Sequence, residues 1–391
     1  MRWLILLLIY FSVEFYAFQA IKKLTSKKSL RWLYLVISLL VLLNLLGHVF
    51  VLPSQPNFMQ DGRAFAAGLF MAVFLPKCLM VILLFLEDIF RILTGITRKI
   101  TRPSNEFHLP SRRKFVSSLA LGIAALPFSS LLYGMYKGKY NFKVLKYVLE
   151  FDELPDAFHG YTLTQISDIH AGSLDDKAMV NYAVDLINEQ QSNCIVFTGD
   201  LVNDKADELS PWLDTFKQLK AEDGVFSVLG NHDYGDYAGW PTQEAKEENF
   251  ERIKNLQRQF GWDLLLNEHR YIYRDNQRIA LVGVENWGEG GFKKAGDLEK
   301  ATRSVDENDF KVLLSHDPSH WEVQILSHPK PIQLTLSGHT HGMQFGIEIP
   351  GWFKWSPVRL RYKQWAGIYE NLGKYINVNR GLGFIGYPGR V

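Results

Sequence analysis

The sequence predicts an α/β domain that follows a bundle of about four transmembrane helices. Two observations lead to this prediction. Apolar runs of strand length recur through the last two thirds of the chain, and each ends in a short polar cluster. The first third instead contains long apolar segments with few charges, which are typical of helices that cross a bilayer. We therefore expect a transmembrane region at residues 1–134 and the α/β domain at residues 135–391.

Four segments of the first third are long enough to span the hydrocarbon core, which needs about 20 residues. They cover residues 3–20, 32–52, 65–86 and 115–133. Ionisable side chains inside such segments are costly unless they are paired or lie near an end. Glu14 and His48 lie near segment ends, where snorkelling explains them. Lys77 follows Pro76 in mid-segment, where we expect a kink or a break and where a functional role is conceivable.

The basic residues of the loops predict the orientation of the membrane region. Loops rich in Lys and Arg stay in the cytoplasm. The loop at 21–31 carries five basic residues and the stretch at 91–114 carries seven, whereas 53–64 contains only Arg63. Four spans would then place the α/β domain on the outer face of the cell membrane. Basic residues at 137, 139, 143 and 146 soften this contrast.

Residues 111–116 have the sequence Ser-Arg-Arg-Lys-Phe-Val and run into an apolar stretch. This pattern resembles a twin-arginine export signal, which would carry a folded domain outward. The alternative is an ordinary basic flank of a membrane anchor. The segment lies behind three other spans and offers only weak cleavage sites, so we expect it to be retained as an anchor.

Five apolar runs in the remaining chain have the length and the β-branched composition of buried strands. Runs without alternating polar residues suit a sheet that is covered on both faces, and the loops at strand ends are where layered α/β folds bind ligands. Cys194 lies inside the second run and Cys78 inside the third span, so neither is expected to form a disulfide or to bind metal. The runs cover residues 161–167, 193–198, 224–229, 310–314 and 332–336.

Each run is followed by a cluster of aspartate, asparagine or histidine. Hard divalent cations prefer carboxylate and amide oxygens with imidazole nitrogens, and two cations about 3.5–4 Å apart can share one carboxylate. Each cluster alone is also compatible with a polar turn, but all five together predict a binuclear metal site in a phosphoesterase. The clusters are Asp168-Ile-His170, Gly199-Asp200, Gly230-Asn231-His232-Asp233, Ser315-His316-Asp317 and Gly338-His339-Thr340-His341.

The order of these clusters resembles that of the calcineurin-like metallophosphoesterase superfamily, over residues 142–391. The resemblance implies a four-layer α/β/β/α sandwich with two mixed sheets and two metal ions at the strand ends. It also implies that Asp200 bridges the two ions. The first ion would be bound by Asp168, His170, Asp200 and His341, and the second by Asp200, Asn231, His316 and His339.

These roles imply that a hydroxide held between two cations attacks phosphorus in line with the leaving oxygen. His232 is the candidate general acid, oriented by Asp233, although His232 could instead only brace the turn. Mn, Fe and Zn all accept this ligand set. Among neighbouring residues, Asn203 could touch phosphate, and we expect the acidic residues at 204, 207 and 208 to be solvated. Asp317 and His320 are expected to steady their loop.

Aromatic residues alternate with cations at residues 351–367, a composition that suits the headgroup layer of a membrane. This favours a lipid-linked phosphoester as the substrate and a place in phospholipid metabolism; the alternative is a loop folded over its own sheet. Membrane-anchored relatives that resemble UDP-2,3-diacylglucosamine pyrophosphatase also suggest a lipid substrate, but that reaction requires a cytoplasmic domain. The net charge of +2 argues against general nucleic-acid binding.

A rival hypothesis from another class is a catalytically idle, metal-binding module whose membrane region acts as a sensor or scaffold. The complete ligand set and the presence of His232 favour the enzyme. Residues 379–390 resemble the closing part of such domains, in which relatives usually continue into one more strand.

Overall fold

The computed structural model describes residues 2–51, 62–101, 113–349 and 351–391. The chain forms two compact units. One comprises the helices up to Gly138 and the other runs from Lys139 to Arg390. We describe them in turn as the membrane unit and the catalytic unit.

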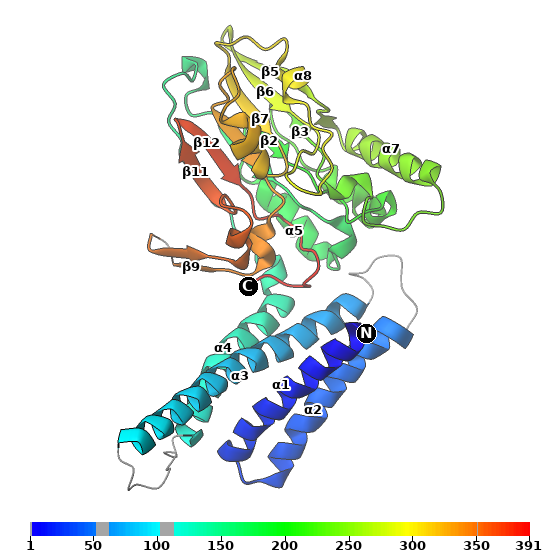
Figure 1. The fold of residues 1–391 in the computed structure, drawn as a ribbon. Coiled ribbons are helices and arrows are strands. Elements are labelled where there is room, and N and C mark those ends of the chain that lie inside the picture. Colours follow the sequence, from blue (N-terminus) through cyan, green and yellow to red (C-terminus); the bar gives the residue numbers. More distant parts are fainter. Residues whose placement is uncertain (1, 52–61, 102–112, 350) are drawn as a thin grey trace. The chain divides into compact units, whose positions relative to one another are not determined.

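The membrane unit consists of four long helices, and each contains a stretch long and apolar enough to cross a bilayer (Figure 1). Side chains such as those of Leu4 and Phe15 are more than half exposed, as expected for a surface that faces lipid. Small residues such as Ala17 and Ala120 pack inside the bundle, where they let the helix backbones approach closely. The helices are α1 (Arg2–Leu24), α2 (Lys28–Leu46, continued by the π-helical turn Gly47–Val51), α3 (Gly62–Thr101) and α4 (Arg113–Tyr136).

Helix α3 has 40 residues and continues through Pro76, so of the kink or break expected there, the break does not occur. Proline is tolerated in membrane helices because neighbouring groups satisfy the backbone carbonyl that it leaves free. At 1.5 Å per residue the helix is about 60 Å long, roughly twice the thickness of the hydrocarbon core. Part of α3 therefore extends beyond the lipid.

A polar cluster lies inside the membrane unit. The ammonium group of Lys77 donates hydrogen bonds to the carboxylate of Glu14 and to Ser38 Oγ, the latter at 2.7 Å. The hydroxyl of Tyr34 donates to the same carboxylate at 2.9 Å. Glu14 is only 8% exposed, so the expectation that it snorkels to the interface is wrong. Its charge is instead neutralised by Lys77 from another helix.

The first residues of the twin-arginine-like pattern, Ser111 and Arg112, lie outside the described residues. Arg113 begins α4 and forms ion pairs with Glu87, at 3.3 Å, and with Asp88, both on α3. These contacts give Arg113 a structural role in joining two helices. They fit the alternative in which this stretch is the basic flank of an anchor.

The catalytic unit contains two β-sheets. The smaller has the order β1-β2-β3-β4, and every pairing in it is parallel. The larger has the order β11-β12-β8-β7-β6-β5, with antiparallel pairs at both edges and parallel pairs between them. The resemblance implied two mixed sheets, but only the larger one is mixed. The strands are β1 (Leu163–Ile166), β2 (Cys194–Phe197), β3 (Val225–Ser227), β4 (Trp262–Leu264), β5 (Glu268–Arg274), β6 (Gln277–Gly283), β7 (Phe310–Leu314), β8 (Leu334–Ser337), β11 (Gly367–Asn371) and β12 (Lys374–Val378).

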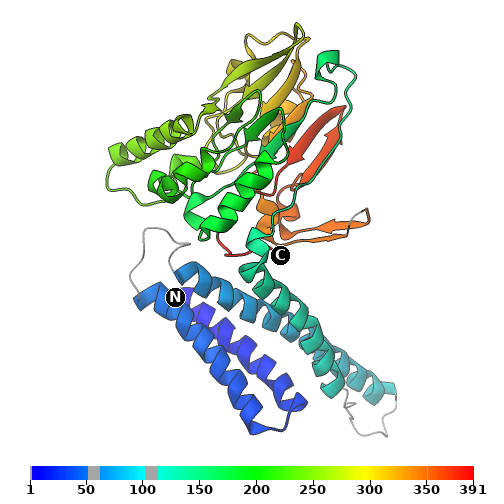
Figure 2. The same ribbon diagram turned by 180° about the vertical axis from the view of Figure 1, so that it is seen from behind.

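The two sheets pack face to face, and helices cover their outer faces. Val196 and Phe226 of the smaller sheet share one buried cluster with Leu281 and Val312 of the larger sheet. A second cluster joins the other face of the larger sheet to α8, and α5 lies across the smaller sheet (Figure 2). This arrangement is the expected four-layer sandwich. The helices are α5 (Lys177–Asn188), α6 (Leu213–Phe216), α7 (Gln243–Gln259) and α8 (Leu298–Thr302).

Helix α5 shows how the sequence specifies one of these layers. Its buried residues, Val180, Ala183, Val184 and Ile187, follow the spacing of a single helix face. Asp176 caps the helix by accepting a hydrogen bond from the amide of Met179. The apolar face therefore turns inward from a well-defined start.

All five strands predicted from apolar runs are present as β1, β2, β3, β7 and β8. Strands β2, β3 and β7 are buried along their whole length, which explains their largely apolar composition. Strand β1 is at the edge of its sheet and is only partly buried. Because these five strands are parallel within their sheets, their carboxyl ends meet at one edge. The polar clusters are therefore brought to the same place.

The cluster around Lys77 yields a prediction for the membrane unit. Replacing Lys77 by Met leaves Glu14 buried without a cation, and breaking a buried pair in this way costs about 3–5 kcal/mol. We expect Lys77→Met to lower the thermal unfolding temperature of the full chain in detergent. Glu14→Gln combined with Lys77→Met should recover most of the loss, whereas Lys28→Met at the exposed start of α2 should change little. Equal unfolding temperatures for the Lys77 and Lys28 variants would contradict the structural role of the pair.

Candidate metal centre

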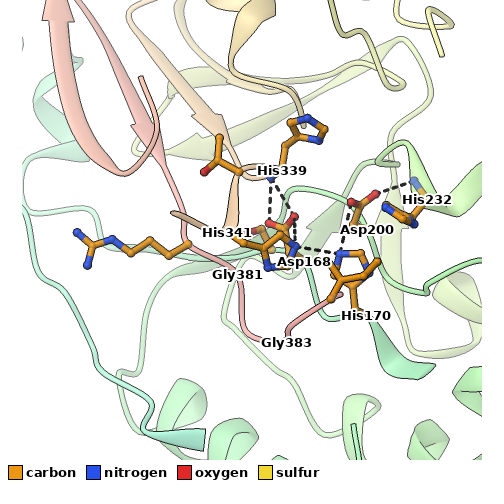
Figure 3. A network of polar contacts seen from close by, with 12 residues as sticks. Asp168, His170, Asp200, His232, His339, His341, Gly381 and Gly383 are labelled. Atoms are coloured by element: carbon orange, nitrogen blue, oxygen red, sulfur yellow. Dashed lines mark hydrogen bonds and ion pairs between the residues drawn. The ribbon is translucent and has the colours of Figure 1, made fainter. Parts of the chain in front are cut away.

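The carboxyl-end loops of five strands bring the seven predicted ligands together. Figure 3 shows five of them, Asp168, His170, Asp200, His339 and His341. Two groups of side chains are arranged so that a cation could be held by each. In both groups the ligand atoms lie within 4.8 Å of one another. One group contains Asp168, His170 and His341, and the other contains Asp200, His316 and His339.

In the first group, two histidines and one aspartate point at a common position. His170 Nε2 lies 3.0 Å from His341 Nε2, and the latter lies 3.3 Å from Asp168 Oδ1. His170 Nδ1 lies 3.1 Å from the amide oxygen of Asn203, which can only accept. A neutral His170 ring therefore directs the lone pair of Nε2 toward the other two ligands.

In the second group, a carboxylate faces an imidazole nitrogen. His316 Nδ1 lies 2.7 Å from the carbonyl oxygen of Thr198, so Nδ1 is the donor and Nε2 of the neutral ring carries a lone pair. This Nε2 lies 3.1 Å from Asp200 Oδ2 and has no hydrogen-bond partner. Two lone pairs that face each other in a buried site repel unless a proton or a metal cation lies between them.

Asp200 lies between the two groups. Its Oδ2 atom is 3.6 Å from His170 Nε2 in the first group and 3.1 Å from His316 Nε2 in the second. The amide of His232 donates to the other carboxylate oxygen at 2.9 Å and fixes its orientation. Asn231 joins the second group because its Oδ1 atom lies 2.8 Å from His339 Nδ1. One carboxylate oxygen is thus placed where two cations could share it.

The electrostatics of the two ligand groups favour cation binding. Burial lowers the pKa of His170 to about 3 and that of His339 to about 4, so both rings stay neutral and keep the lone pair that binds metal. Burial also raises the pKa of Asp168 to about 6. Burial alone would lower the pKa of His316 as well, but the Asp200 carboxylate has the larger effect and raises this pKa to about 10. In the absence of metal, a proton thus takes the position between these two side chains.

Five of the seven residues have a left-handed backbone conformation, which is uncommon for residues other than glycine. The φ angles are 48° for Asp168, 47° for His170, 61° for Asp200, 72° for His339 and 51° for His341. Such conformations cost of order 1–3 kcal/mol each and persist only where surrounding contacts impose them. The left-handed backbone directs each of these side chains from the end of its strand toward the centre.

The loop that follows β12 imposes part of this conformation. The amide of Gly383 donates to the carbonyl of Asp168 at 2.8 Å, and a Cβ atom at this position would collide with the carbonyl of Ile169. Gly381 also packs directly against Asp168 (Figure 3). The guanidinium of Arg390 donates to three carbonyls of this loop, at residues 380, 381 and 383. The chain segment near Arg390 therefore supports the first group of ligands.

Asp233 has a different role from the one expected. Its carboxylate accepts hydrogen bonds from the amides of Gly230, Asp200 and Leu201 at 2.8–3.0 Å. The ring of His232 is instead held by the carbonyl of Asn203, which lies 2.7 Å from Nδ1. The expectation that Asp233 orients His232 is therefore wrong. Buried amides in these tight loops need an acceptor, and the carboxylate of Asp233 meets that need.

The acidic residues after the second cluster also differ from the expectation. Glu208 was expected to be solvated, but it is 4% exposed. Its carboxylate accepts hydrogen bonds from four backbone amides, including those of Gly172 and Asn203. Asp204 is half-buried and accepts from the amide of Tyr237, and Asp207 alone is fully exposed. Glu208 thus joins the first two loops, and Asn203 contacts two histidines of the centre.

A cavity of about 230 Å³ opens beside the metal-ligating groups. His232 lines it, together with the aromatic rings of Tyr237 and Phe292 and the side chain of Ile385. Tyr237 lies in the 234–240 stretch that follows the third cluster. Phe292 comes from a segment without any motif, so no sequence signal pointed to it, whereas Ile385 lies in the 379–390 stretch that resembles the closing part of such domains.

The aromatic stretch at 351–367 contributes to the centre through one residue. The hydroxyl of Tyr362 lies 2.8 Å from His339 Nε2 and 3.4 Å from Asp317 Oδ2. Tyr362 and Trp365 are buried, whereas Trp352 is 80% exposed. The stretch is thus partly folded over its own sheet and partly exposed. Asp317 also accepts from the amide of Ser319, as expected for a residue that steadies its loop.

Comparison with known proteins agrees with the geometry. Residues 161–343 match the family model described as calcineurin-like phosphoesterase, and residues 1–139 match one described as probable calcineurin-like phosphoesterase, transmembrane domain. The chain is 28% identical to a transmembrane protein with metallophosphoesterase domain of Danio rerio, over 80% of this chain and 68% of that protein. It is 29% identical to an uncharacterized metallophosphoesterase of Helicobacter pylori, over 72% of this chain and 69% of that protein. A Bacillus subtilis protein named uncharacterized metallophosphoesterase YkuE is 26% identical, over 71% of this chain and 92% of that protein.

The two matched regions correspond to the two compact units of the structure. The relatives carry the name of the same enzyme class. The chain therefore belongs to the calcineurin-like metallophosphoesterases, as a phosphoester hydrolase with a four-helix transmembrane region.

Proposed function

We propose that the seven clustered side chains hold two divalent cations and that the enzyme hydrolyses a lipid-linked phosphoester at the membrane surface. The convergence of two ligand groups on Asp200 is the observation that carries the metal assignment, because the atoms of each group lie within 4.8 Å of one another and Asp200 contacts both groups. The donor set of nitrogen and oxygen atoms suits Mn, Fe or Zn.

The first cation would be held by Asp168, His170, Asp200 and His341. The second would be held by Asp200, Asn231, His316 and His339. Bound cations supply Lewis acidity toward phosphoryl oxygen and lower the pKa of water toward neutrality.

The remaining roles belong to side chains of the cavity. His232 is the proposed general acid, because Nδ1 is held by the carbonyl of Asn203 and the ring lines the cavity. In this arrangement Nε2 is the atom that delivers a proton to the leaving oxygen. Asn203 and Asp233 are positioning residues. Asn203 aligns both His170 and His232, and Asp233 fixes the loop that carries Asp200.

The substrate assignment rests on the size of the cavity and on the membrane unit. A volume of about 230 Å³ accommodates a phosphoryl group, while the rest of the substrate remains outside. The four transmembrane helices keep the catalytic unit beside a lipid surface. A pyrophosphate-linked lipid is an alternative of the same class, and it would require a cytoplasmic catalytic unit.

The sidedness follows from the basic loops. The short loop between α1 and α2 and the helix ends beside it carry Lys22, Lys23, Lys27 and Lys28, which favour the cytoplasm. Four spans then put the catalytic unit on the outer face of the cell membrane. Export through the twin-arginine pathway would be one route to this location.

Metal dependence gives the first test of this function. Purified full-length protein in detergent should hydrolyse bis(p-nitrophenyl) phosphate after addition of Mn²⁺, and a chelator should abolish the activity. Loss of a residue that only supports a metal ligand typically costs about 10–100-fold in activity. Because Asn231 is itself a proposed ligand, we expect Asn231→Ala to reduce kcat/KM by more than this. Asn255→Ala on the exposed face of α7 is the matched control and should leave the rate unchanged.

The same experiment separates the enzyme from the idle scaffold. Bound metal together with equal rates for the wild type, Asn231→Ala and the reaction without protein would favour the scaffold. Elemental analysis of the purified protein identifies the metal in either case.

The role of His232 can be tested through the leaving group. General acid catalysis contributes about 10²–10⁴-fold when the leaving oxygen needs a proton, and much less for p-nitrophenolate, which leaves readily as an anion. We therefore expect His232→Gln to reduce hydrolysis of an alkyl phosphodiester far more than that of bis(p-nitrophenyl) phosphate. His159→Gln, at an exposed position, should affect neither substrate. An equal loss on both substrates would assign His232 to substrate or loop positioning instead.

Sidedness is tested with sealed membrane vesicles of known orientation. Protease should degrade the catalytic unit in right-side-out vesicles and spare it in inside-out vesicles. The opposite pattern would support the cytoplasmic alternative and the pyrophosphate-linked substrate.

A further inference from the structure

A two-stranded hairpin emerges from the fifth metal loop. Strands β9 (Ile347–Ile349) and β10 (Phe353–Trp355) pair antiparallel with each other and with no strand of the two sheets. The hairpin begins six residues after His341. It projects from the body of the catalytic unit in both views (Figure 1 and Figure 2).

The register gives the hairpin two different faces. Residues directly opposite in an antiparallel pair lie on the same side. Ile347 pairs with Trp355 and Ile349 with Phe353, so these four side chains form one apolar face. The pair between them, Glu348 and Lys354, lies on the other face.

The polar face is the one that contacts the protein. Glu348 forms an ion pair with Arg380, in the loop that also contacts the first ligand group. Lys354 donates to the carbonyl of Ala366 and lies 4.8 Å from the centre of the Trp365 ring. Burial against this surface lowers the pKa of Lys354. The hairpin is therefore attached through its charged side chains.

Three of the four side chains of the apolar face are exposed, and Trp355 is half-buried. Ile347 is 51% exposed, Ile349 44% and Phe353 45%, and Trp352 in the turn is 80% exposed. A half-buried strand in water normally has the opposite polarity, with apolar residues inward. An exposed apolar face of this kind marks a surface that is covered by something else.

A bilayer is the occupant that fits this surface. Helix α4 ends at Tyr136 and the catalytic unit starts at Lys139, so the tether between them is Lys137 and Gly138, a span of about 10 Å at full extension. Because this tether is short, the bilayer is an apolar phase that is always available to the catalytic unit. Next to the hairpin, Leu360 is 90% exposed between Arg359 and Arg361, which suits a layer of acyl chains and phosphates.

We propose that the β9–β10 hairpin inserts its apolar face into the interfacial layer of the bilayer and holds the mouth of the metal centre at the lipid surface. The hairpin can hold the mouth there because it lies between His341 and Tyr362 in the sequence, and Tyr362 contacts His339. The catalytic consequence, access to lipid-linked phosphoesters, rests on the function proposed above. Membrane insertion itself does not depend on it.

Insertion is tested without any activity. A spin label is placed at Trp352→Cys in the full chain, in a Cys78→Ala, Cys194→Ala background, and the protein is reconstituted in vesicles of phosphatidylcholine and phosphatidylglycerol. We expect the label to be more accessible to oxygen than to a water-soluble nickel complex. The control label at Tyr273→Cys, 63% exposed on β5, should show the reverse. Water accessibility at both positions would overturn the proposal.

The catalytic consequence is tested with two substrates. Ile349→Ser combined with Phe353→Ser removes apolar surface, whose transfer to lipid is favourable. We expect an about tenfold or greater loss of hydrolysis of a vesicle-borne p-nitrophenyl phosphodiester lipid. Hydrolysis of soluble bis(p-nitrophenyl) phosphate should stay within about twofold, because the serines lie outside the cavity.

The outcomes separate this inference from the proposed function. Failure of the wild type to hydrolyse either substrate would refute the function but leave the spin-label result decisive for insertion. Unchanged hydrolysis of the vesicle substrate by the double variant, with an active wild type, would overturn the role of the hairpin. A wild type that is dimeric in nanodiscs and a double variant that is monomeric would assign the apolar face to a second copy of the chain instead.

Discussion

The carboxylate of Asp200 is the interaction on which the catalytic unit depends. One of its oxygens lies between His170, which follows β1, and His316, which follows β7 in the other sheet. Its second oxygen accepts the amide of His232 after β3. A single buried group therefore links three loops and both halves of the sandwich. Because it is fully buried, its charge has to be balanced inside the protein, and the histidines around it are placed to do this.

The sequence was a good guide to the strands and to the residues that carry chemistry. Runs such as 194–197 and 310–314 are apolar on both faces because helices and the opposite sheet cover them, and such strands are recognisable without tertiary information. The polar clusters follow the strands because the chain must turn there. Because the turns at the carboxyl ends of parallel strands lie at one edge, the sequence was enough to predict that Asp168, Asp200 and His341 come close together.

The supporting contacts could not be predicted in the same way. Glu208 and Asp233 are acidic residues in loops, where solvent exposure is the usual state, yet both are buried as acceptors for backbone amides. Their partners lie on other loops, and no local pattern records them. The contacts of Arg390, which supports the centre from the other end of the domain, were also not predictable from a local pattern. The pairing of Lys77 with Glu14 depends on how two membrane helices are rotated against each other, which the sequence does not give. The hairpin at 347–355 shows a further limit, because alternation gives its two faces but not which of them meets the protein.

The left-handed conformation of five ligand residues also has a consequence for how this family changes over time. Glycine adopts such φ angles without strain, so at His170, His339 and His341 it would relieve backbone strain while removing a ligand. At Asp168 and Asp200 glycine would also remove a carboxylate that accepts a backbone amide. A lineage that turned the same scaffold to another use would therefore be free to accept glycine first at the three histidines, and the composition of these positions would record which descendants still work as hydrolases.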